Sequence, residues 1–151
     1  MPRVTFYALA DGTDNPQQDL MEAAATLALD TYQARKWMLI HCQTQEQAVA
    51  LDEFIWQFPA DRFIPHNLIG EGPQQGTPVE IAWQGQTLKS CHTALNLTES
   101  MLDEYKQYQH IIDFVPVDEQ AKQAARDRYK QYKQAGCAMH FQPLATLYES
   151  N

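Results

Sequence analysis

The stretch WMLIHC at residues 37–42 decides the class of fold, because it is a short and continuous apolar run. Runs of this length are typical of strands that a parallel sheet buries on both faces. Thr44, followed three residues later by Gln47, forms a capping box and predicts that a helix begins directly after the run. A buried strand that leads at once into a helix is the repeating unit of an α/β protein.

The same alternation of strand and helix extends toward the amino end. Residues 3–9 alternate between apolar and polar side chains, which predicts a strand. Asn15 and Pro16 are the residue types of a helix cap and of a first helical position. Apolar residues then recur at spacings of three and four over residues 17–35, which predicts an amphipathic helix.

The alternation also extends toward the carboxyl end. Residues 109–115 predict a strand that Pro116 stops, and a helix over 118–135 follows, which Gly136 ends. Weaker patterns predict a loop at 59–78, strands at 79–83, within 87–97 and at 137–142, and a weak helix at 98–108. We therefore expect a single α/β domain over residues 1–151, with a mainly parallel sheet and helices on both faces.

Composition and charge exclude several classes of protein. The chain has 151 residues, of which 44% are hydrophobic and 11% aromatic, so it is one folded domain rather than a disordered chain. Its net charge of −8 argues against a general binder of nucleic acid or of anionic membranes. No apolar run approaches the ~20 residues of a membrane span. Three widely spaced cysteines and the lack of a signal peptide indicate reduced thiols and a cytoplasmic protein.

The motifs of common enzyme classes are absent from the sequence. The first strand-to-helix loop has only Gly12, whereas loops that cradle phosphate are rich in glycine, and the spacing of the glycines in 70–76 fits neither phosphate-binding motif. His41-Cys42 and Cys91-His92 are adjacent pairs, and neighbours on a strand point to opposite faces, so they are poor metal ligands. We expect no catalytic, cofactor or metal site. A nucleotide-using α/β enzyme, or an inactive relative of one, stays open from the alternation alone.

Positive charge is concentrated in the helix predicted at 118–135. Residues 120–136 hold five basic residues against one acid, a net charge of +4, so the rest of the chain carries −12. Lys122, Arg126, Tyr129 and Lys133 fall within about 60° of one another on a helical wheel. Together with Phe114 and Val115 at the end of the preceding strand, this stripe would place an apolar floor beside a basic wall. Arg128 lies near the neighbouring stripe, where we expect its side chain to snorkel toward solvent.

Three interpretations of this stripe remain. An apolar floor beside a basic wall suits a peptide with acidic residues, a terminal apolar side chain and a free carboxylate. The same spacing is also typical of a helix face that is simply solvated. Binding of single-stranded DNA through the cations and Tyr129 is a third interpretation, which the −12 carried elsewhere disfavours.

A second candidate surface is aromatic. Trp56 and Phe58 close the second helix, and Phe63 and Ile64 follow in the next loop. Trp56 is not on the core-facing side of its helix, so this cluster is either a partner-binding patch or a cap on the edge of the core.

Several segments together carry a resemblance to a known family. They are TFY at 5–7, LDE at 51–53 with Trp56, FIPHNL at 63–68, GEGP at 70–73, PVEIAW at 78–83, DFVP at 113–116, and Lys122, Ala125-Arg126, Arg128-Tyr129-Lys130, Tyr132 and Gly136. In these segments the chain resembles the chi subunit of bacterial DNA polymerase III, a part of the clamp-loader complex. The match weakens across 84–108 and over the last dozen residues.

The resemblance implies a non-catalytic adaptor without a cofactor. Chi-like proteins have an α/β fold similar to mononucleotide-binding domains but lack a phosphate-binding loop. They bind the acidic C-terminal tail of the single-stranded-DNA-binding protein and, on another surface, the psi subunit, which links them to the clamp loader. Direct contact with nucleic acid or a membrane is not expected. The resemblance and the stripe assign the tail site to Lys122, Arg126, Tyr129, Val115 and Lys133, and the psi-facing side to Trp56, Phe63 and Ile64.

Overall fold

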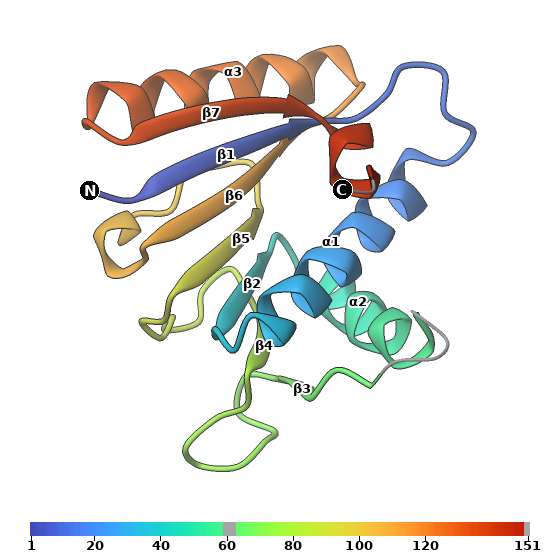
Figure 1. The fold of residues 1–151 in the computed structure, drawn as a ribbon, viewed down its shortest axis with the longest axis vertical. Helices are drawn as coiled ribbons and strands as arrows, with labels where there is room; N and C mark the ends of the chain where they lie inside the picture. Colours follow the sequence, from blue (N-terminus) through green and yellow to red (C-terminus); the bar gives the residue numbers. More distant parts are fainter. Residues whose placement is uncertain (59–62, 150–151) are drawn as a thin grey trace.

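A computed structural model describes residues 1–58 and 63–149, and in this part of the chain seven strands form one parallel sheet (Figure 1). The strands are β1 (Arg3–Ala8), β2 (Met38–Cys42), β3 (His66–Leu68), β4 (Val79–Trp83), β5 (Thr93–Leu97), β6 (His110–Val115) and β7 (Ala138–Pro143). Their order across the sheet is β3-β4-β2-β5-β6-β1-β7, so β3 and β7 are the two edges. Every pairing is parallel, which confirms the predicted α/β class.

The helices cover both faces of the sheet, as the sequence predicts. They are α1 (Pro16–Gln33), α2 (Gln45–Gln57) and α3 (Glu119–Gln134), with two short 3₁₀ helices, η1 (Tyr105–Gln107) and η2 (Leu144–Tyr148). In Figure 1, α1 and α2 lie on one side of the sheet and α3 lies on the other, along β7 and β1. Each face has its own hydrophobic cluster, one packed under α1 and α2 and one under α3.

The strand β2 shows why a continuous apolar run belongs in this sheet. All five of its residues are buried. Met38 and Ile40 belong to the cluster under α1 and α2, whereas Leu39 between them belongs to the opposite cluster. Because successive side chains point to opposite faces, a strand that is covered on both sides needs apolar residues at nearly every position.

The helix starts follow from the capping residues that the sequence contains. The side chain of Asn15 accepts a hydrogen bond from the backbone N–H of Gln18 at the start of α1. Thr44 accepts one from the N–H of Gln47 at the start of α2, and Asp118 caps α3 in the same way. These side chains replace the carbonyl partners that the first turn of a helix lacks.

Two sequence-based expectations differ from the structure. The weak helix predicted at 98–108 is only the single turn η1, because this segment mostly forms irregular loop against the sheet. The loop predicted at 59–78 contains the edge strand β3, which has three residues and is too short to show a period of two. Residues 59–62 of that loop lie outside the described residues.

Candidate functional site

A pocket of about 570 Å³ lies where the carboxyl ends of β1 and β6 meet α3. Its lining includes Ala8 and Leu9 from the end of β1, Val115 and Pro116 from the end of β6, and side chains from α3. The carboxyl ends of strands are where open α/β sheets bind their ligands. The helix that follows β6 therefore contributes side chains to the usual ligand position of this fold.

One side of the pocket is apolar. Val115 and Pro116 meet Ala125 there, and Phe141 of β7 adds a ring that is 57% exposed. Tyr129 is held against the core, because its ring packs edge-on against Phe6 with 5.3 Å between the ring centroids. The pocket thus offers apolar contact area on a rigid floor.

The other side of the pocket is basic. Lys122, Arg126 and Lys130 line it, and Asp11 from the loop after β1 is the acidic neighbour. The Nζ atom of Lys122 lies 3.9 Å from Oδ1 of Asp11 and 3.8 Å from Oε1 of Glu119, and such exposed pairs are weak. Within the described residues, the side chains of Arg126 and Lys130 make no hydrogen bond and no salt bridge. Two cations are therefore available to an anionic ligand.

A buried ion pair fixes α3 to the sheet beside this pocket. Arg128 donates from Nε to Oδ2 of Asp113 at 3.0 Å and from Nη2 to Oδ1 at 3.1 Å. The exposed fractions of the two residues are 5% and 1%. The expectation that Arg128 snorkels to solvent is wrong, because the carboxylate of Asp113 on β6 holds its guanidinium beneath the helix. Arg128 also donates from Nη1 to the carbonyl of Glu99 at 3.0 Å.

The structure brings together four of the five residues predicted for the tail site. Lys122, Arg126, Tyr129 and Val115 all line the pocket, and Lys133 does not. The lining residues of α3 extend from Lys122 to Lys130, and Lys133 lies three residues beyond Lys130, or about 4.5 Å further along the helix axis. Lys133 shares the stripe but not the pocket.

The lining residues that the sequence did not predict include Lys130 and Phe141. Lys130 is about 80° from Lys122 on the helical wheel and so falls outside the narrow stripe. Phe141 comes from a strand far along the chain, opposite Phe6 in the register of β1 and β7. Its only sequence signal is a large aromatic residue in the short segment AMHFQP, which does not show where the strand lies in the sheet.

The aromatic cluster forms a surface patch at the other edge of the sheet. Trp56 and Phe63 are 58% and 64% exposed, with 5.7 Å between their ring centroids. The ring of Trp56 also lies 4.6 Å from that of His66, which is buried and bonded through its ring nitrogens to the carbonyls of Ile64 and Asp52. Ile64 is only 1% exposed, which corrects its placement on the patch: its side chain packs into the core beneath.

The loop after β1 does not have the form of a phosphate-binding loop. The amino end of α1 is already capped by the side chain of Asn15, and Asp19 in its first turn adds negative charge. The hydroxyl of Thr13 donates to the carboxylate of Asp19. A phosphate would therefore meet a capped helix end and a carboxylate, which repels it.

Thiol and metal chemistry find little support in the described residues. Burial raises the pKa of the Cys42 thiol to about 12 and that of Cys91 to about 11, so neither forms the reactive thiolate at neutral pH. Among residues 1–58 and 63–149, no three histidine, cysteine or acidic side chains gather as metal ligands.

In the same part of the chain, no helix has both the length and the apolar character that crossing a bilayer requires.

The open, all-parallel sheet with helices on both faces and the pocket at its carboxyl edge define a single α/β domain. Solved structures with this fold include yeast (S. cerevisiae) Dbp5 L327V bound to RNA and ADP BeF3 (TM-score 0.60, 10% identity over 98% of this chain) and a DEAD box protein from Methanococcus jannaschii (TM-score 0.51, 10% identity over 95%). This chain spans 43% and 41% of those two chains, and at this identity the likeness concerns the fold alone.

Sequence comparison then gives the family. A family model described as "DNA polymerase III chi subunit, HolC" matches residues 1–140. DNA polymerase III subunit chi of Escherichia coli (strain K12) is 41% identical over 90% of this chain and 94% of its own. The corresponding subunit of Haemophilus influenzae is 39% identical over 87% and 90%. The chain belongs to the chi subunit family of DNA polymerase III, whose members are accessory subunits of DNA replication.

Proposed function

We propose that this chi subunit is a non-catalytic adaptor that binds the acidic C-terminal tail of the single-stranded-DNA-binding protein in the pocket beside α3. The observation that carries the proposal is the pairing of an apolar floor with cations that have no carboxylate partner in the described structure. Val115 and Phe141 offer contact area, and Arg126 and Lys130 offer charge. A terminal apolar side chain would fill the floor while Arg126 binds the terminal carboxylate.

Charge distribution supports a tail rather than a DNA strand as the ligand. The chain as a whole carries −8, so a long polyanion is repelled, whereas a short acidic peptide needs only the local basic wall. Capture by a few exposed charges and one small pocket corresponds to about micromolar affinity, or roughly −8 kcal/mol. Many tails on one DNA-bound assembly would raise the effective affinity by avidity.

The exposed aromatic patch of Trp56 and Phe63 is the proposed contact for the psi subunit, and through it for the clamp loader. Two large rings that are more than half exposed are typical anchors of a protein interface. The patch lies by the edge strand β3, and the tail pocket lies beneath α3 near the opposite edge, so both partners fit at once (Figure 1). An adaptor at the replisome of a bacterium would act in the cytoplasm.

A nucleotide-using enzyme is the alternative that the fold alone suggests. The capped helix and the acidic first turn after β1 disfavour it. A thermal-shift screen with ATP, GTP and NAD tests it, because a ligand at 100 times its Kd stabilises the folded state by ~2.7 kcal/mol. Stabilisation by any of the three would support the alternative over the adaptor.

The adaptor proposal is tested by titrating the full chain with a fluorescent peptide that has the acidic, Pro-Phe-ending tail of a single-stranded-DNA-binding protein. A matched peptide without the terminal Phe is the control. We expect about micromolar binding that weakens with added salt, because much of the attraction is between exposed charges. The control peptide should bind much more weakly. Equal binding of both peptides, or binding of neither, contradicts the proposal.

A further inference from the structure

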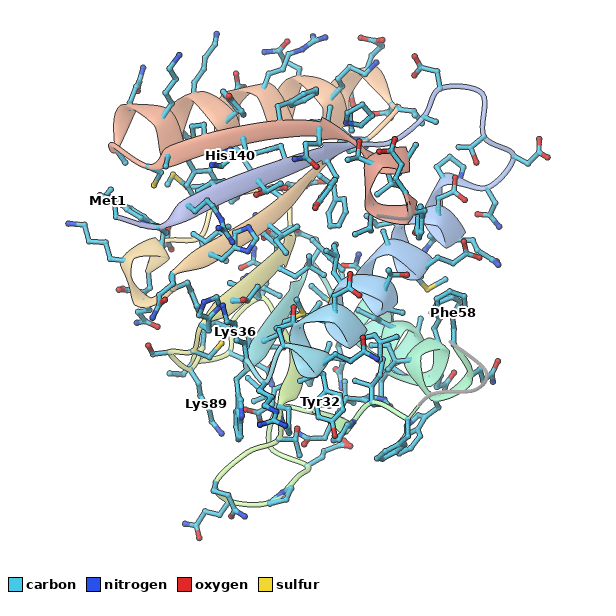
Figure 2. All side chains as sticks on the ribbon, viewed as in Figure 1. Met1, Tyr32, Lys36, Phe58, Lys89 and His140 are labelled. Atoms are coloured by element: carbon cyan, nitrogen blue, oxygen red, sulfur yellow. The ribbon has the colours of Figure 1, made fainter. Side chains whose placement is uncertain are left out.

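A second group of basic side chains lies at the opposite ends of the strands, on the sheet face that carries α1. It comprises Arg3 of β1, His110 of β6, His140 of β7, His92 just before β5 and Lys36 just before β2. The strand register places Arg3 beside His110, and Thr5 of β1 beside His140. In Figure 2 the labelled Lys36 and His140 lie in the same half of the view as Met1, toward the amino ends of the strands. We call these five residues the amino-end cluster.

Arg3 is held in place without being neutralised. Its Nη2 atom lies 3.3 Å from Nδ1 of His110, and the other ring nitrogen of His110 lies 3.0 Å from the hydroxyl of Thr5. A ring nitrogen that accepts from a guanidinium is unprotonated, so His110 is a neutral partner. Arg3 makes no salt bridge within residues 1–58 and 63–149. Its guanidinium is therefore oriented by an imidazole and keeps its full charge.

Lys36 adds a second cation to Arg3, and the histidines add ring nitrogens that can form hydrogen bonds. The pKa of His110 falls to about 4, first because of burial and then because of Arg3, His92, His140 and Lys36. Burial also lowers the pKa of His92, and Lys36 and Arg3 add to that effect. No carboxylate acts on either histidine among the described groups. In a chain with 19 acidic and 11 basic residues, Arg3 and Lys36, neither of which has a salt-bridge partner among the described residues, form a local concentration of positive charge.

We propose that the amino-end cluster is a binding site for a small phosphate-bearing ligand. Arg3 would donate to the phosphate oxygens through its free N–H groups, and His92, His140 and Lys36 would complete the site. A phosphate group fits because it accepts several hydrogen bonds and carries the charge that the cluster lacks. The net charge of −8 favours a single phosphate group over a nucleic-acid strand, because a strand would also meet the acidic remainder of the surface.

The test is a titration of the histidine ring signals of the full chain with inorganic phosphate, followed by NMR. Sodium chloride is adjusted to hold the ionic strength constant, so that screening does not change. We expect saturable shifts of the His92, His110 and His140 signals, and a rise in the pKa of His92, because a bound dianion favours its protonated form. Arg3→Gln should weaken phosphate binding about tenfold or more, since it removes a charge-assisted donor. Lys133→Gln removes the same charge from α3 and should leave phosphate binding unchanged.

Three outcomes would overturn the proposal. The first is a set of shifts that do not saturate, or that sodium chloride reproduces. The second is an equal affinity of the Arg3→Gln protein, which folds normally because Arg3 is exposed. The third is binding of a short single-stranded oligonucleotide at the cluster without binding of phosphate, which would assign the surface to nucleic acid instead.

Discussion

Arg126 and Arg128 are two positions apart in the sequence and have opposite environments. Residues two positions apart on an α-helix point in directions that differ by about 200°. One of the two side chains therefore faces away from the sheet when the other faces it. Arg128 meets the buried carboxylate of Asp113, whereas Arg126 lines the open pocket. Arg128, which holds the helix to the sheet, and Arg126, which is proposed to bind the tail, are the same residue type. Their position on the helix decides their different environments.

Arg126→Glu should weaken tail binding at least about tenfold, because it replaces a cation that attracts the acidic peptide with an anion that repels it. The folded state should be almost unaffected, since an exposed substitution usually changes stability by less than about 0.5 kcal/mol. Fluorescence anisotropy with the tail peptide measures the first effect, and thermal unfolding measures the second. Lys133→Glu makes the same charge change outside the pocket, and an equal loss with both variants would place the tail along the whole of α3.

Asp113→Ala should destabilise the protein by about 3–5 kcal/mol, because it leaves the guanidinium of Arg128 buried without a counter-charge. Urea unfolding gives the free energy. The double variant Asp113→Leu with Arg128→Met should recover most of the loss, because an apolar pair of similar volume often replaces a buried ion pair at little cost. A single Asp113→Ala variant as stable as the natural chain would show that the pair does not hold α3.

Stability should fall as the pH drops from about 6.5 to about 4, in part because of His110. Its pKa is about 4 in the folded chain against the ordinary 6.5 of a histidine, so the unfolded chain binds the extra proton between these limits. Above this window His110 contributes no pH dependence. Urea unfolding in phosphate-free buffer at pH 7 and pH 5 measures the slope. His110→Gln should flatten it, whereas His140→Gln, which removes only one of the smaller contributions to the pKa of His110, should change it less. An unchanged slope in His110→Gln would contradict the assignment.

At the scale of elements, α3 owes its position to both of its ends and to one buried side chain. Asp118 caps its first turn. Tyr132 in its last turn is fully buried, and its hydroxyl oxygen accepts a hydrogen bond of 2.9 Å from the backbone N–H of Leu102. The helix that lines the pocket is therefore fixed along its length.

Asp118→Ala should cost about 1 kcal/mol of stability, because it removes the side chain that accepts from the N–H of Ala121. Asp118→Ser keeps an acceptor at this position and should cost less. Chemical unfolding of the three proteins compares them. Equal stabilities for the Ala and Ser variants would mean that the cap does not contribute and that tertiary contacts alone hold the first turn.

At the scale of the whole molecule, the sheet separates two surfaces. The aromatic patch lies by the edge strand β3, and the basic pocket lies near the edge strand β7. The five strands between these edges form a layer with a hydrophobic cluster on each face. Binding at one surface has no evident route for changing the other, so we expect little energetic coupling between them.

Trp56→Ala should weaken binding of the psi subunit by tenfold or more, because it removes an exposed aromatic anchor of the kind that dominates interfaces. Its affinity for the tail peptide should equal that of the natural chain. Calorimetry with each partner, alone and with the other bound, measures both affinities and their coupling. A tail affinity that changes when psi is bound would contradict the independence of the two surfaces.

Local patterns in the sequence determined the elements and one side of the site. The apolar run of β2, the caps Asn15 and Thr44, and the charges of α3 depend on residues within a few positions of one another. Lys122, Arg126 and Tyr129 were predicted to lie together because one helix carries all three, and the helical repeat fixes their relative directions.

Only the tertiary structure decided which distant residues meet. It placed β1 between β6 and β7, which brought Phe141 to the pocket, and it paired Arg128 with Asp113. It also buried Ile64, gathered the amino-end cluster from three strands and from the residues that precede two others, and left Lys133 beyond the pocket. Periodicity reports which face of an element is apolar, whereas the packing of that face against its neighbours decides strand order and long-range pairs.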